Sequence, residues 1–72
     1  MLTLAKLRMM NEVLPTLPVI CKESGINYNS LIKRMNRLSP ELSTVESIKL
    51  KAEIDRKLNQ VFEIINGNED EN

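Results

Sequence analysis

The chain has 72 residues, and its ten basic and ten acidic side chains give a formal net charge of zero. A chain of this length forms one small domain, which buries only about 60 % of the surface exposed by the unfolded chain, so its core is marginal. A single cysteine excludes an internal disulfide, and the absence of histidine leaves no ligand set for a tetrahedral metal site, so we expect no metal or cofactor and a homodimer as the source of further stability.

The first predicted element is a helix within Leu2 to Leu14. Its apolar positions recur every three or four residues, at Leu4, Leu7, Met10 and Leu14. This is the period of an amphipathic helix. Pro15 lacks an amide hydrogen and clashes with the preceding turn, so it predicts the end of this helix.

A short second helix is predicted from about Leu17 to Ser24. Thr16 is a suitable cap, and Pro18 is tolerated in the first turn, where amides have no internal partner. The apolar positions are Leu17, Ile20 and Cys21. Gly25 follows where a left-handed backbone would close the helix.

Asn27 is a favourable cap for a third helix, from Tyr28 to about Leu38. The predicted buried stripe is Leu31, Met35 and Leu38, and the opposite side carries Asn29, Lys33, Asn36 and Arg37. Ser39 and Pro40 predict the end of the helix.

Residues 44–66 allow two interpretations after the capping box predicted at Ser43 and Glu46. In the first, a fourth helix ends near Asp55, with apolar positions at Val45, Ile48, Leu50 and Ile54, and a fifth is lined by Leu58, Val61, Phe62 and Ile65. In the second, one helix runs from Thr44 to Asn66 and pairs with a second copy through Ile54, Leu58, Val61 and Ile65. We favour the break, because an unbroken helix would expose apolar residues on too many sides. Residues 1–66 then form the domain, and residues 67–72 form a disordered acidic tail.

The segment from Leu17 to Arg37 contains the residues that two helices need to meet at a steep angle. Cys21 is small enough for a close crossing, Gly25 supplies the turn, Ile26 fills the corner and Leu31 closes the contact. The outer side of the second helix of such a pair is convex, and it fits a major groove about 12 Å wide.

This segment resembles the helix-turn-helix of bacterial and phage DNA-binding proteins. The rest of the chain is similar to the five-helix domain of Cro and phage-repressor regulators, with Thr44, Glu46, Leu50, Leu58, Val61 and Phe62 in the places of the family's later helices. The resemblance implies an all-α domain of four to five helices that binds double-stranded DNA as a dimer on a two-fold operator. Half-sites would lie about 34 Å apart, and binding would repress transcription.

The resemblance also implies which residues contact DNA. The expected base contacts are Asn27, Tyr28, Asn29, Ile32 and Lys33. Asparagine can bond to adenine, lysine to guanine, and isoleucine can meet a thymine methyl. The expected phosphate contacts are Ser30, Arg34 and Arg37, and the expected dimer interface is Leu58, Val61, Phe62 and Ile65.

The distribution of charge along the chain agrees better with DNA binding than the net charge of zero does. Residues 1–66 carry ten basic against seven acidic side chains, a surplus of three positive charges. The alternative is a helical adaptor for another protein, which the neutral sum would suit. An enzyme is not expected, because the chain has no histidine and no nucleophile motif. We also expect a cytoplasmic protein without a membrane segment or a small-molecule substrate, since no apolar run approaches the ~20 residues of a membrane span.

Overall fold

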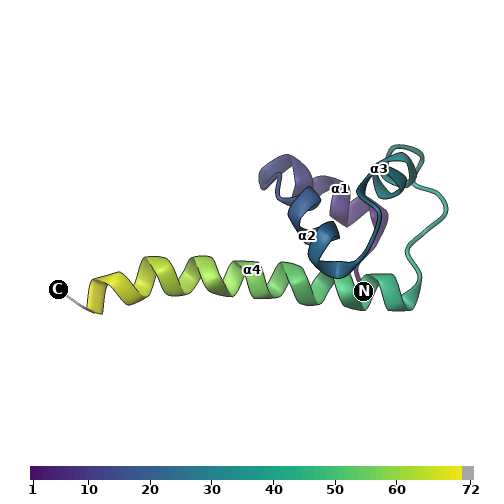
Figure 1. The fold of residues 1–72 in the computed structure, drawn as a ribbon. Helices are drawn as coiled ribbons and strands as arrows, with labels where there is room; N and C mark the ends of the chain where they lie inside the picture. Colours follow the sequence, from purple (N-terminus) through teal and green to yellow (C-terminus); the bar gives the residue numbers. More distant parts are fainter. Residues whose placement is uncertain (71–72) are drawn as a thin grey trace.

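The fold consists of four helices in the part of the chain that the computed structural model describes, which is the backbone of residues 1–70 and the side chains of residues 1–67. They are α1 (Leu4–Val13), α2 (Leu17–Ser24), α3 (Tyr28–Arg37) and α4 (Thr44–Asp70). Helices α1 to α3, which we call the body, gather over the first half of α4, while its second half projects alone (Figure 1). The expected all-helical class is confirmed.

Local side-chain caps define where α1 and α4 start, whereas Thr16, the expected cap of α2, forms no side-chain cap hydrogen bond. Thr3 Oγ1 accepts a hydrogen bond from the Lys6 amide at the start of α1. At the start of α4 the capping box forms as expected, because Ser43 N donates to Glu46 Oε1 at 2.9 Å and Glu46 N donates to Ser43 Oγ at 3.1 Å. Each cap gives an otherwise unpaired terminal amide a partner.

The core draws on all four helices and on the loop between α3 and α4. Its buried members are Leu4, Leu7, Leu17, Ile20, Cys21, Leu31, Met35, Leu42 and Leu50. Burial raises the pKa of the Cys21 thiol, so this cysteine is an unreactive packing residue. Leu38 was expected in the core, but it takes a left-handed conformation at the end of α3 and is half exposed. Leu42 is buried instead.

The predicted break near Asp55 is wrong, because α4 is one helix. The segment around Asp55 contains no helix-breaking residue, and Lys51 pairs with Asp55 at 2.8 Å one turn away. Lys57 pairs with Glu23 of α2 at 3.0 Å, and Arg56 also bonds to Glu23. The two ion pairs with Glu23 attach the middle of α4 to the body, and the pair between Lys51 and Asp55 supports the helix itself.

The fold also differs from the expected packing along α4. The side facing the body carries Ser47 and Leu50, both buried, whereas Val45 and Ile48 lie outside and are exposed. Because residues 1–70 contain no fifth helix that folds back, the body does not cover the apolar residues beyond Asp55. The unbroken helix thus exposes apolar residues on several sides.

The end of α4 lies later than expected. The helix continues past Asn66 to Asp70, so the first residues of the expected acidic tail are helical, and residues 71–72 lie outside the described residues. No helix in the described part of the chain has both the length and the apolar character that crossing a membrane requires.

Candidate nucleic-acid interface

The corner between α2 and α3 forms at Gly25, as the sequence predicted. Gly25 has φ 73°, a left-handed conformation that favours glycine. The Ile26 amide donates to the Cys21 carbonyl at 3.0 Å, which closes the end of α2. The Ile26 side chain packs against the core. The corner therefore redirects the chain within three residues and starts α3 at Tyr28.

Helix α3 is held on the body by its cap and its inner side. Asn27 Oδ1 accepts a hydrogen bond from the Ser30 amide at 2.9 Å. Leu31 is 0 % exposed and Met35 is 3 % exposed, one turn apart on the inner side. Because residues four apart share a helix face, this burial fixes which side chains of α3 point outward.

The outward side of α3 is a continuous polar surface. Five exposed side chains, which we call the polar face, form it: Asn29, Ser30, Lys33, Asn36 and Arg37. No residue of α3 carries a carboxylate. The face therefore combines amide and hydroxyl groups with two cations.

The expected base-contacting residues divide into two groups. Asn29 and Lys33 lie on the polar face, and Asn27 lies exposed at its beginning. Tyr28 and Ile32 are only partly exposed, because both pack against the core. They form the edge of the polar face rather than its centre. Asn36 also lies on the polar face, as its spacing of three residues from Lys33 predicts, but it was not among the expected DNA contacts.

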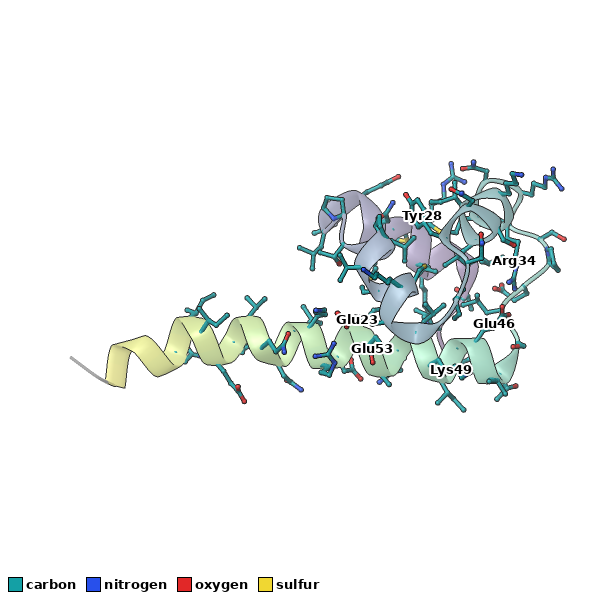
Figure 2. The ribbon with its side chains drawn as sticks, viewed as in Figure 1. Glu23, Tyr28, Arg34, Glu46, Lys49 and Glu53 are labelled. Atoms are coloured by element: carbon teal, nitrogen blue, oxygen red, sulfur yellow. The ribbon has the colours of Figure 1, made fainter. Side chains whose placement is uncertain are left out.

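Arg34, an expected phosphate contact, does not lie on the polar face, because its guanidinium is bound within the protein. Its guanidinium donates to both Glu46 carboxylate oxygens, at 2.7 and 2.9 Å, and to the Pro40 and Glu41 carbonyls, at 3.0 and 3.1 Å. Four of its five N–H donors are thus used inside the protein. Figure 2 shows Arg34 and Glu46 between α3 and the start of α4.

The Arg34 clamp, meaning Arg34 with these three acceptors, fixes α3 to the loop and to α4. The arginine and the Ser43 amide together hold the pKa of the Glu46 carboxyl at about 2. The same pairing raises the pKa of Arg34. The sequence indicated the capping role of Glu46. Its ion pair with Arg34, twelve residues away, depends on how α3 packs.

The expected dimer residues lie away from the polar face. Leu58, Val61, Phe62 and Ile65 are on the projecting half of α4, each between 44 and 66 % exposed. The structure therefore separates the two predicted sites along the molecule.

The lowered pKa of Glu46 predicts how the free energy of unfolding depends on pH. Since its pKa is about 2 in the folded protein against an ordinary 4.5, the carboxylate stabilises the fold above about pH 4.5, and this contribution is lost as pH falls towards 2. We expect a loss on the order of 2 kcal/mol, less than the full pKa difference implies because Glu46 keeps some solvent contact. Urea unfolding near pH 6 and near pH 3 measures it.

The control for the pH dependence is Glu46→Gln, which cannot titrate. The fall in unfolding free energy between the two pH values should be smaller in this variant than in the unmodified chain. Equal falls would show that other carboxylates cause the acid loss.

No family model, curated protein or solved structure matches this chain.

Proposed function

We propose that the chain is a sequence-specific regulator of transcription that binds double-stranded DNA through a helix-turn-helix formed by α2 and α3. The observation that carries the proposal is the polar face of α3. It presents five exposed polar or cationic side chains on a helix whose opposite side, at Leu31 and Met35, is buried. A helix of this kind can lie in the major groove with its exposed side against the base edges.

The composition of the polar face suits base recognition. Asn29 can bond to adenine with both groups of its amide, and Lys33 can donate to the acceptors of guanine. Tyr28 and Ile32, at the edge of the face, offer apolar contact to a thymine methyl.

Phosphate contacts fall to Ser30 and Arg37, which are exposed on the same side of α3. Such contacts set the position of the protein on the duplex without reading sequence. Arg34 supports binding indirectly, because the clamp keeps α3 in place. With few cations on the face, we expect specific affinity to depend on direct base contacts.

Regulation would follow from occupancy of a two-fold operator by a homodimer, with repression by exclusion of polymerase. The exposed apolar residues of the α4 projection support a second copy as partner. This proposed function involves no small-molecule substrate and no cofactor.

Removal of two side chains from the polar face tests the proposal. A preferred duplex is first selected from a random library. We then expect Asn29→Ala and Lys33→Ala each to weaken its binding by about 1–3 kcal/mol, which is about 5- to 150-fold, and to relax preference at one base position. Both residues are exposed, so unfolding free energies should change by less than about 0.5 kcal/mol.

Lys49→Ala is the matched control, because Lys49 is exposed on the side of α4 away from α3 (Figure 2). It removes one positive charge without touching the polar face. If all three variants bind the selected duplex equally, α3 is not the recognition helix.

The second candidate is an adaptor that binds another protein through α4. The observation in its favour is the exposed apolar projection, together with zero net charge. Salt separates the two candidates. Binding of DNA through several phosphates weakens by orders of magnitude as salt rises, whereas an apolar interface between proteins responds little.

A further inference from the structure

The projecting half of α4 carries an apolar surface that the body does not cover. Leu58 is 44 % exposed, Val61 50 % and Ile65 60 %, and Phe62 and Ile64 flank them at 66 and 64 %. Five large apolar side chains within the eight residues 58–65 expose an area of the order of 500 Å², at the upper end of what single-chain proteins show. Surfaces of this kind mark an interaction site.

The spacing along α4 aligns part of this surface into one stripe. The α4 stripe consists of Ile54, Leu58, Val61 and Ile65, at intervals of four, three and four, which is the spacing of a helix-pairing surface. Leu50, one turn before Ile54, is buried against the body. Because residues four apart share a face, the stripe continues the side of α4 on which the body sits. Figure 1 shows no other element over this side of the projection.

The position of the body limits how two copies can pair through the α4 stripe. In a parallel pair both bodies would lie at the same level, each on the side of α4 that faces the partner, and they would occupy the same space. In an antiparallel pair the bodies lie at opposite ends, and each projection runs along the other. Only the antiparallel direction therefore covers the whole stripe.

The stripe is self-complementary in one antiparallel register. If Leu58 lies opposite Val61 of the second copy, then Ile54 lies opposite Ile65. Two-fold symmetry repeats both pairs, so four pairs of apolar side chains meet along the two helices. At the Ile54 end there is a pocket of about 290 Å³ between α1 and α4. It is lined by Met1, Leu2, Lys6, Met10, Lys51 and Ile54. In this register Ile65 of the second copy reaches the level of this pocket, and the residues after it pass the body on the α1 side, where the pocket is open.

We infer that a second copy of the chain binds the α4 stripe in antiparallel direction, with Ile65 of each copy seated in the pocket between α1 and α4 of the other. Covering the exposed apolar surface of both projections would bury on the order of 1,000 Å², the lower limit for a specific interface. The inference rests on the homodimer of the proposed function, but it does not depend on DNA binding.

Disulfide capture tests both direction and register. In a Cys21→Ala background, one chain carries Ile54→Cys and another carries Ile65→Cys, and the mixture is oxidised with oxidised glutathione. The register brings residue 54 of one copy opposite residue 65 of the other. Two copies of residue 65 would be 11 positions apart along the helices, about 16 Å at 1.5 Å per residue, beyond the reach of a disulfide.

We expect cross-linked dimers in the mixture and none from either variant alone. Dimers from Ile65→Cys alone would indicate parallel pairing and overturn the inference. Absence of cross-links from all samples would overturn it too, provided that circular dichroism shows both variants folded. Sedimentation of the unmodified chain as a monomer at the concentration used would have the same consequence.

The outcome is independent of the test on the polar face. An antiparallel dimer that binds no selected duplex would refute the proposed function and leave the α4 pairing standing. A chain that binds its duplex but cross-links only through residue 65 would refute the pairing and leave DNA recognition standing.

Discussion

Leu31→Ala is expected to lower the free energy of unfolding by about 2–5 kcal/mol, because it leaves a cavity in the core. Leu31 is 0 % exposed and lies between α3 and the rest of the body. A chain of 72 residues has little stability to lose, so the variant should be largely unfolded at moderate temperature. Urea and thermal unfolding followed by circular dichroism measure the effect.

The adjacent residue provides the control for Leu31. Ser30→Ala changes an exposed side chain on the same helix, and we expect a change of less than about 0.5 kcal/mol. If Leu31→Ala is as stable as Ser30→Ala, Leu31 is not in the core. The conclusion that the polar face points outward would then fail as well.

Arg34→Met is expected to lower the free energy of unfolding by about 2 kcal/mol. The substitution removes the partner of the Glu46 carboxylate and the donor to the Pro40 and Glu41 carbonyls. An acceptor that loses its partner costs about 1–3 kcal/mol when it is buried, and the 18 and 28 % exposure of the Arg34 and Glu46 side chains keeps the total moderate. Urea unfolding at neutral pH measures the loss.

Arg37→Met is the matched control, because it removes the same charge three residues later from an exposed position. We expect it to leave stability within about 0.5 kcal/mol and to weaken DNA binding. A double-mutant cycle of Arg34→Met with Glu46→Gln should yield a coupling of about 1–2 kcal/mol. Zero coupling would mean that the ion pair contributes nothing to the attachment of α3.

The Arg34 clamp and the buried residues of α3 have a common consequence for the proposed site. The clamp holds one end of α3 to the loop and α4, while Leu31 and Met35 hold its inner side to the core. The polar face is therefore presented on a helix fixed at several points. Groups fixed in this way lose less conformational entropy when they bind a base edge.

Much of the secondary structure follows from short stretches of sequence. The end of α2 at Gly25, the start of α3 after Asn27 and the start of α4 after Ser43 agree with the predictions. Capping and turn formation depend on residues within about four positions of one another, so the sequence alone contains the information. The inner side of α3 followed in the same way from the spacing of Leu31 and Met35.

The role of Arg34 could not be predicted in this way. Its position next to Lys33 and Arg37 in the sequence suggested one cationic surface, but the tertiary fold directs it towards Glu46. An ion pair across twelve residues depends on where the loop after α3 returns. Long-range packing therefore decided which cations remain available to a partner.

The helical class, the starts of most helices and the polar side of α3 can all be read from the amino-acid sequence, because they depend on local hydrogen bonds and on periodicity. The continuity of α4 and the projection of its second half depend on how the helices pack. This half projects because α1, α2 and α3 together cover only the first half of that helix. The body is complete without a fifth helix, and the remaining apolar residues of α4 lie on the surface.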